Sequence, residues 1–262
     1  MPPRVFQSTI VGSEPEMGDA KRITITVPEG MAGEARAGHF VNVLCRGHFA
    51  FDPLLRRPYS VMRALQAEQA IEILVRPFGR GSGWLCEQPV GTVLDVMALH
   101  GNTFTVNPTT RNLLLVAGGV GAAPLVMLAV EALAKGLNVT YLMGAANADG
   151  LLSASQLPAG VEYVVATDDG SQGHHGFVTD LAPEYARWAD QVFTCGPEPM
   201  FRSLRAALAP HRIGGRPPIQ VSMERSMACG VGACLGCVVE TKRGMSASCV
   251  DGPVYDMDFV TW

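Results

Sequence analysis

The pattern of apolar and polar positions divides the chain into two parts near Pro108. Before Pro108, short apolar stretches alternate with turns that contain Gly and Pro, a pattern typical of a small antiparallel β barrel. We expect strands at residues 5–11, 23–27, 40–45, 59–62, 71–75 and 93–97. One helix is expected in this part, at about residues 82–88.

After Pro108 the apolar stretches become longer and helices alternate with strands. Residues 113–117 form a continuous apolar strand, which a glycine loop joins to an apolar helix at about 124–135. Further strands are expected at 139–143, 161–166, 191–194 and 219–223, and a further helix at 198–208. Strands that alternate with helices indicate a parallel sheet covered on both faces, so we expect a β barrel followed by an α/β unit.

Composition and charge exclude several classes of protein. The 262-residue chain is 48% apolar and 17% charged, as expected of a globular protein with a buried core. A formal net charge of −4 provides no basic surface for nucleic acid. The chain has neither the ~18 uninterrupted apolar residues of a membrane span nor the basic start and apolar run of a secretory signal. We therefore expect a cytoplasmic protein with no nucleic-acid and no membrane partner.

Four of the seven cysteines lie close together near the end of the chain. Cys229, Cys234 and Cys237 have the C-x4-C-x2-C spacing of plant-type [2Fe–2S] ligands, and Cys249 follows. The intervening residues are mostly small, so the loop can turn its amide groups toward the sulfurs. Four thiolates also suit tetrahedral zinc, but structural zinc sites more often combine two C-x2-C pairs and only one is present here. The last interval is shorter than in plant-type ferredoxins.

A short motif in the first part indicates a flavin site. Arg57, Pro58, Tyr59 and Ser60 lie at the start of a predicted strand. Pro58 favours an extended Arg57, whose guanidinium can bind a pyrophosphate with two hydrogen bonds. Downstream, a predicted strand ends and a glycine turn that can seat a phosphate leads into a helix. The candidate residues there are Leu74, Val75, Arg76, Gly81 and Ser82.

Three motifs in the second part indicate a dinucleotide site. Gly118, Gly119, Gly121 and Pro124 follow an apolar strand and open a helix, where backbone amides and the helix dipole favour a pyrophosphate. This GG-x-G-x-x-P sequence differs from the G-x-G-x-x-G fingerprint of the Rossmann fold. The other candidates follow later strands, and cysteines at helix starts are often reactive. They are Asp168, Cys195, Gly196 and Pro197.

Together these motifs resemble the ferredoxin–NADP reductase superfamily. The resemblance implies that Arg57 holds the FAD phosphates and that Tyr59 and Ser60 line the isoalloxazine ring. It also implies that Cys195 lies near the nicotinamide, which makes Ser60 and Cys195 the candidate catalytic residues. NAD is favoured over NADP, because residues 144–149 contain no Arg or Lys to bind a 2′-phosphate.

The stretch E-R-x-M-x-C-G-x-G-x-C-x-x-C, which begins at Glu224, narrows the resemblance to the electron-transfer subunits of NAD-dependent (class 1B) dihydroorotate dehydrogenase. That resemblance implies a ferredoxin-reductase-like FAD barrel at 1–107, an NAD-binding α/β domain at 108–218 and a [2Fe–2S] domain at 219–262. A flavin stands between a one-electron cluster and a two-electron nicotinamide.

The implied partner is an FMN-containing catalytic subunit that oxidises dihydroorotate to orotate in pyrimidine biosynthesis, within an A2B2 heterotetramer. One alternative is the small subunit of an NADH-dependent ferredoxin:NADP oxidoreductase, or of a related hydrogenase or sulfite reductase. Another is a non-catalytic, zinc-stabilised nucleotide-binding module.

Overall fold

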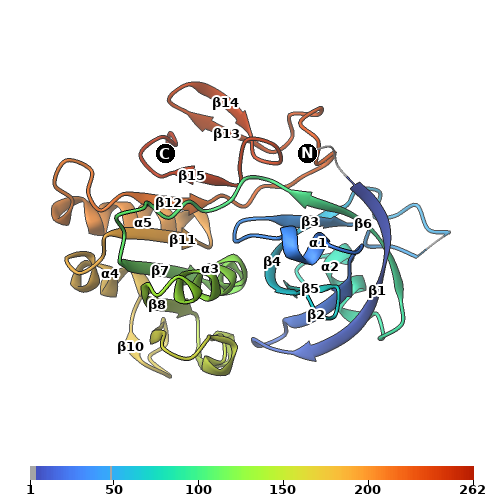
Figure 1. Ribbon diagram of the computed structural model, residues 1–262, viewed down its shortest axis with the longest axis horizontal. Helices are drawn as coiled ribbons and strands as arrows, with labels where there is room; N and C mark the ends of the chain where they lie inside the picture. Colours follow the sequence, from blue (N-terminus) through green and yellow to red (C-terminus); the bar gives the residue numbers. More distant parts are fainter. Residues whose placement is uncertain (1–3, 48) are drawn as a thin grey trace.

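The first part of the structure, a computed structural model that describes residues 4–47 and 49–262, is a closed antiparallel barrel. The barrel strands follow the order β1-β2-β5-β4-β3-β6 and occupy one side of the molecule (Figure 1). Each overlaps a stretch predicted from the apolar pattern. Their bounds are β1 (Arg4–Pro15), β2 (Lys21–Thr26), β3 (Phe40–Val43), β4 (Arg57–Leu65), β5 (Ala70–Val75) and β6 (Val93–His100).

Alternating burial explains why β2 forms a strand. In β2, Ile23 and Ile25 are fully buried and Thr24 between them is only half-buried, so one face of the strand forms the barrel core. Helix α2 (Arg80–Glu87) follows β5 and confirms the helix expected at 82–88. A short helix, α1 (Met31–Glu34), was not expected.

The second part is a sheet in the order β10-β9-β8-β7-β11-β12-β15, parallel except for β15. β7 supplies apolar side chains to both faces, because Leu113 and Leu115 pack in one core and Leu114 and Val116 in the other. The strand bounds are β7 (Asn112–Gly118), β8 (Asn138–Ala145), β9 (Glu162–Thr167), β10 (His174–His175), β11 (Gln191–Cys195), β12 (Ile219–Ser222) and β15 (Val254–Asp256).

Three α-helices cover this sheet. Helix α3 (Ala122–Ala134) lies between the sheet and the barrel, where Glu131 accepts a hydrogen bond of 2.9 Å from the Ala37 amide (Figure 1). Helices α4 (Val178–Ala186) and α5 (Glu198–Leu208) cover the other face. The sequence did not indicate α4. It contains Pro183, which removes a backbone donor, but Ala182 and Ala186 are buried and their packing compensates. Short 3-10 turns are η1 (Gly119–Gly121), η2 (Ala148–Gly150), η3 (Ala154–Gln156) and η4 (Ala209–His211).

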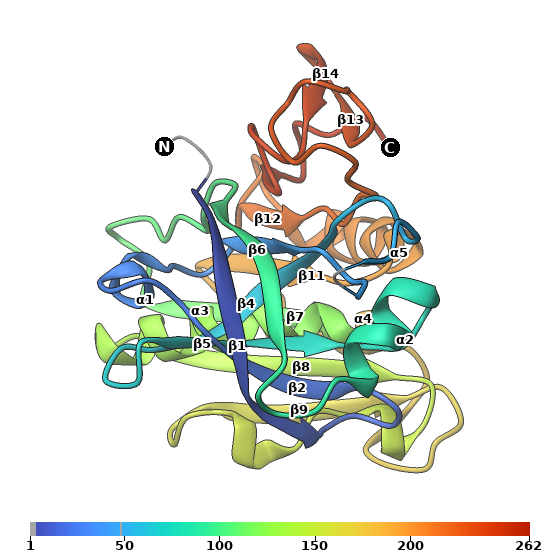
Figure 2. The same cartoon turned by 90° about the vertical axis from the view of Figure 1, so that its right-hand side faces the viewer.

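The last segment adds β12 and β15 to the sheet and extends beyond it as a hairpin of β13 (Val238–Thr241) and β14 (Gly244–Ala247) (Figure 2). Asn102 clamps this segment to the end of the barrel. Its side chain donates to the carbonyls of Asp251 (2.9 Å) and Val254 (2.8 Å) and accepts from the Val254 amide (2.9 Å). The domain limits 1–107, 108–218 and 219–262 stay predictions, since β12 and β15 belong to the same sheet as β7. Of the helices in the described ranges, none has the length and apolar character needed to cross a membrane.

Candidate redox site

Three of the four clustered cysteines, Cys229, Cys234 and Cys237, lie on one loop, and Cys249 follows the β13–β14 hairpin. A backbone N–H group points at each of the four sulfurs. Gly230 (φ 72°) and Gly232 (φ 76°) adopt left-handed backbone conformations that favour glycine. These turns direct amides at the sulfurs, as expected from the small residues between the cysteines. The contacts run from Val231 N to Cys229 Sγ (3.4 Å), Gly232 N to Cys249 Sγ (3.2 Å), Gly236 N to Cys234 Sγ (3.4 Å) and Cys249 N to Cys237 Sγ (3.4 Å).

The sulfurs are arranged as two pairs. The Cys229 thiol lies near that of Cys234, and the Cys249 thiol lies near that of Cys237. Backbone N–H groups, that of Val231 first, lower the pKa of Cys229 to about 6, whereas burial and the neighbouring Cys237 raise the pKa of Cys249 to about 12. Within residues 4–47 and 49–262, no three His, Cys, Asp or Glu side chains group closely enough for one metal ion. Two thiol pairs with N–H donors fit a two-iron cluster better than one tetrahedral zinc ion.

The cysteine loop packs directly against the barrel. Phe40 of β3 forms a small buried cluster with Met227, Cys237 and Cys249. Phe40 is the cross-strand partner of Ser60 in β4, the last residue of the flavin motif. The fold therefore places the cysteine pairs next to the strand that carries this motif.

Two arginines precede Pro58, and the structure distinguishes them. Arg56 is held by Asp95, to whose carboxylate (2.8 Å) and backbone carbonyl (2.9 Å) its guanidinium donates. Arg57 donates only to the backbone carbonyls of Leu55 (2.8 Å) and Arg56 (3.2 Å), and it has no acidic partner among the described residues. A Cβ on Gly81, in the first turn of α2, would lie 3.4 Å from Arg57 Nε. Arg57 therefore presents an unneutralised charge beside a helix N-terminus, an arrangement that suits a phosphate.

The other flavin candidates stay predictions, and the structure shows what each contacts. The Tyr59 hydroxyl lies 3.6 Å from Cys45 Sγ, and burial raises its pKa. The Ser82 hydroxyl accepts from the amides of Phe78 (2.9 Å) and Gly79 (3.0 Å), which commits it to the turn before α2. Leu74 and Val75 are buried in the barrel core, so only their backbone is available to a cofactor. Arg76 is paired with Asp19 and points to the dinucleotide side.

A cavity of about 550 Å³ lies at the carboxyl ends of the parallel strands. In open α/β sheets, ligands bind at this edge. Five of the predicted dinucleotide residues line it: Gly118, Gly119, Asp168, Gly196 and Pro197. Gly121, Pro124 and Cys195 are buried outside the lining.

The glycines let the loops at this cavity pack together. A Cβ on Gly121 would lie 2.4 Å from the carbonyl oxygen of Cys195, and a Cβ on Gly118 would lie 2.7 Å from Met200 Sδ. Real Cβ atoms do not approach other atoms so closely. A methyl group added at either glycine would therefore overpack this interior. The absence of a side chain at Gly121 therefore lets the start of α3 pack directly against the end of β11.

Cys195 is buried outside the cavity lining, whereas Glu224 is part of that lining. Cys195 is 1% exposed, and burial raises its pKa well above the ordinary thiol value. The reactive role expected of Cys195 stays a prediction, and its raised pKa disfavours the thiolate form. Glu224 lines the cavity, and the surrounding protein raises its pKa, although the open cavity still admits solvent to it.

The sequence reasoning did not select all of the lining residues. Glu224 belongs to the cysteine motif but was not proposed as a site residue. Its position directly after a predicted strand is the sequence feature that could have identified it. Phe177, Val178 and Thr179 enter the lining with α4, the helix that was not expected. Arg76 is the one basic residue in the lining described, and Asp19 neutralises it, which favours NAD over NADP.

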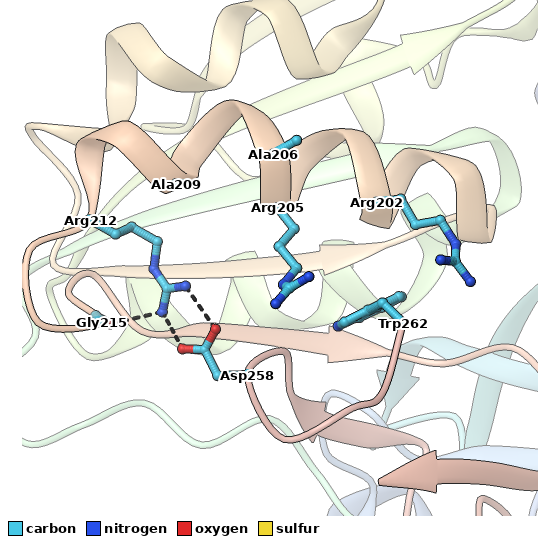
Figure 3. A pocket seen from close by; sticks show the side chains of 8 residues that line it. All are labelled: Arg202, Arg205, Ala206, Ala209, Arg212, Gly215, Asp258 and Trp262. Carbon is cyan, nitrogen blue, oxygen red and sulfur yellow. Dashed lines mark hydrogen bonds and ion pairs between the residues drawn. The ribbon is translucent and has the colours of Figure 1, made fainter. Parts of the chain in front are cut away.

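A second cavity, also of about 550 Å³, lies between α5 and the end of the chain (Figure 3). None of the predicted site residues lines it. Arg212 is bound there by both oxygens of Asp258 (2.9 and 2.7 Å), and Arg202 is paired with Glu198 at 2.7 Å. The charged side chains of this second cavity are largely held in these ion pairs, and we therefore do not assign the redox site to this cavity.

Comparison with known proteins gives relatives across nearly the whole chain. The family model for the iron-sulfur cluster binding domain of dihydroorotate dehydrogenase B matches residues 224–261. The electron transfer subunit of dihydroorotate dehydrogenase B (NAD(+)) from Geobacillus thermodenitrificans is 35% identical over 83% of this chain and 84% of its own. The subunit of that name from Desulforamulus reducens is 35% identical over 86% of each chain.

Solved structures agree with the fold. The NADH-dependent reduced ferredoxin-NADP oxidoreductase matches with a TM-score of 0.85 and 28% identity over 97% of this chain and 90% of the other. The Amycolatopsis cytochrome P450 reductase GcoB shares the fold, with a TM-score of 0.69 over 84% of this chain and 69% of its own. These matches confirm the expected ferredoxin-reductase-like barrel, parallel sheet and C-terminal iron–sulfur region. With relatives more than 30% identical over most of its length, the chain belongs to the family of electron transfer subunits of dihydroorotate dehydrogenase B (NAD(+)).

Proposed function

We propose that this chain carries electrons from the FMN of a dihydroorotate-oxidising partner subunit, through a [2Fe–2S] cluster and FAD, to NAD⁺. One observation supports this path above the others: the paired cysteines pack on β3, which is hydrogen-bonded to the flavin-motif strand β4. The dinucleotide cavity opens at the edge of the adjoining sheet. This packing supports neighbouring sites for cluster, flavin and nicotinamide in one chain.

Cys229, Cys234, Cys237 and Cys249 are proposed as the cluster ligands, two for each iron. The backbone N–H groups that point at their sulfurs stabilise the thiolate form that metal binding needs. Cys234 is exposed and Cys237 and Cys249 are buried, so a cluster held by these residues would face solvent on the Cys234 side. That exposed side is where a partner subunit can pass electrons in.

Arg57 and the first turn of α2 are proposed to bind the FAD pyrophosphate, and Tyr59 and Ser60 to lie along the isoalloxazine ring. When bound, the flavin accepts electrons singly and releases them as a hydride. Gly118, Gly119, Gly196 and Pro197 are proposed to let the dinucleotide backbone approach the sheet. Cys195, a neutral buried thiol, then supports the nicotinamide end by packing rather than by accepting charge.

The relatives' name implies a catalytic partner subunit. We propose that this partner carries FMN, that two copies of each chain form an A2B2 assembly, and that the assembly works in the cytoplasm. One further candidate has an observation in its favour. The match to the NADH-dependent ferredoxin-NADP oxidoreductase covers 97% of the chain, so a role as the small subunit of such an enzyme shares the same three carriers.

The proposal is tested by purifying the chain anaerobically with its native partners and recording the visible spectrum after adding dihydroorotate. We expect bleaching of both the flavin and the cluster bands, followed by recovery when NAD⁺ is added. If NADH alone bleaches the bands, the three carriers are present but the dihydroorotate assignment fails.

Two cysteine variants control the experiment. Cys237→Ser should abolish the cluster bands and the passage of electrons from dihydroorotate, while FAD remains bound. Cys86→Ser is the matched control, because Cys86 is also buried but lies in α2, away from the loop. An intact cluster spectrum in Cys237→Ser would show that the ligand set is wrong.

A further inference from the structure

Strand β3 presents alternate side chains to two different environments. Val41 and Val43 are fully buried in the barrel core. Phe40, one residue earlier, packs instead with Cys237 and Cys249. Because side chains alternate along a strand, Asn42 shares the face of Phe40 and lies under the cysteine loop.

The Asn42 side chain is buried without a hydrogen-bond partner. It is 1% exposed, and neither Nδ2 nor Oδ1 has a partner among the described residues. At the same interface His100, whose ring stacks on Phe40 at 5.4 Å, has a buried Nε2 in the same condition. Most buried amides in native proteins are paired, so the unpaired Asn42 amide is available to a group outside the polypeptide.

The amide nitrogen faces the cysteine loop at one point. A Cβ on Gly230 would lie 2.6 Å from Asn42 Nδ2 and 2.8 Å from Met97 Cε. Gly230 directly follows Cys229, so the amide lies against the backbone at that ligand. Asn42 is also the cross-strand partner of Pro58, in the flavin motif. The side chain therefore lies between the cysteine loop and the strand proposed to carry the flavin.

We propose that the Asn42 Nδ2–H group donates a hydrogen bond to a sulfur on the Cys229 side of the [2Fe–2S] cluster and raises the reduction potential of that cluster. This inference rests on the proposed function. Reduction adds negative charge to the cluster, and hydrogen bonds to its sulfurs stabilise that charge. A buried donor acts strongly, because water does not compete for it. Asn42 thereby shifts the equilibrium distribution of electrons between the cluster and FAD toward the cluster.

Spectroscopy of the wild-type holoprotein tests the contact without any mutation. The protein is produced with asparagine labelled with ¹⁵N in its side-chain amide and reduced with dithionite, and pulsed EPR is used to detect ¹⁵N coupling to the cluster. We expect a coupling that is absent from Asn42→Leu and retained in Asn138→Leu. Asn138 is the control because it lies exposed at the start of β8.

The midpoint reduction potential of the cluster provides the second readout. Asn42→Leu keeps the side-chain volume and removes the donor, so the midpoint potential of its cluster should fall, while that of FAD stays unchanged. A tenfold shift in the electron distribution between the two groups corresponds to about 59 mV for one electron. We expect a fall of about this size at full iron content.

The outcomes separate this inference from the proposed function. If reduced wild-type protein has no [2Fe–2S] EPR signal, the proposed function itself fails. A normal EPR signal without ¹⁵N coupling overturns only the role of Asn42, as does an unchanged cluster potential in Asn42→Leu. A shift confined to the FAD potential would overturn it in favour of a contact with the flavin. If Asn42→Leu does not fold, the ¹⁵N coupling measured in the wild-type protein alone decides whether Asn42 contacts the cluster.

Discussion

Replacing Arg57 with Gln tests whether the flavin motif binds phosphate through the residue that the structure selects. Arg57 lies beside Gly81 at the start of α2, and only backbone carbonyls accept its hydrogen bonds. A hydrogen bond to a charged group contributes about 1.5–3 kcal/mol. Since 1.4 kcal/mol is a factor of ten, the Kd for FAD should rise about 10- to 150-fold. The lower end is the better expectation, because Arg57 gives up its carbonyl contacts to bind phosphate.

The assay is quenching of flavin fluorescence as FAD is added to the deflavinated protein. Arg56→Gln is the matched control, because Arg56 is the adjacent residue and its charge is already neutralised by Asp95 at 2.8 Å. We expect Arg56→Gln to lower the free energy of unfolding while the FAD Kd changes less than threefold. A Kd within twofold of wild type in Arg57→Gln, or a larger effect in Arg56→Gln, would refute the reasoning.

Three further predictions concern the packing at Gly121, the attachment of the cysteine segment by Asn102 and the pH dependence of stability at Glu224. Gly121→Ala places a methyl group 2.4 Å from the Cys195 carbonyl oxygen, so urea unfolding should show a loss of about 1–3 kcal/mol together with weaker NADH binding; unchanged stability would contradict the packing argument. Asn102→Ala removes three hydrogen bonds to the cysteine segment, about 1 kcal/mol each, and should speed the loss of iron to a chelator while FAD is retained; equal rates would show that the clamp is not needed. Glu224 is exposed to the open cavity, but the surrounding protein raises its pKa, so the folded protein binds its proton more tightly than the unfolded chain does. This carboxylate therefore lowers stability as the pH rises from its ordinary value of 4.5 through the raised one, by an amount that solvent screening keeps small. Urea midpoints of the cofactor-free Glu224→Gln protein should therefore exceed those of wild type at pH 8 and converge with them toward pH 4.5, and parallel curves would exclude this role.

Much of the fold was predictable from the sequence because it rests on local patterns. Alternating burial in β2 and continuous burial in β7 follow from the two environments that strands meet, one face or both faces covered. The clustering of Cys229, Cys234 and Cys237 was predictable because C-x4-C-x2-C spacing is a local property of one loop, and their role as cluster ligands stays a prediction. Cys249 follows the β13–β14 hairpin and reaches them through the fold. Helix α4 was not, since Pro183 argues against a helix locally and only packing on the sheet compensates for it.

The assignment of roles within the site required the tertiary structure. Arg56 and Arg57 are chemically identical neighbours, and what separates them is Asp95, 39 residues away from Arg56 in sequence. Cys195 follows the reactive-cysteine pattern at a helix start, yet the fold buries it and keeps it a neutral thiol. Local residue types name candidates, whereas charge state and access depend on which distant segments surround them.

The sequence by itself determined which carriers this chain can hold, because cluster spacing, the flavin tetrapeptide and the glycine loops are contiguous and each suits one ligand chemistry. Only the tertiary structure decided how the segments with these motifs come together. It placed the cysteine loop on β3 by the Asn102 clamp and left the Asn42 amide buried between that loop and the flavin strand. Electron transfer depends on such contacts between segments far apart in the chain, and no local pattern encodes them.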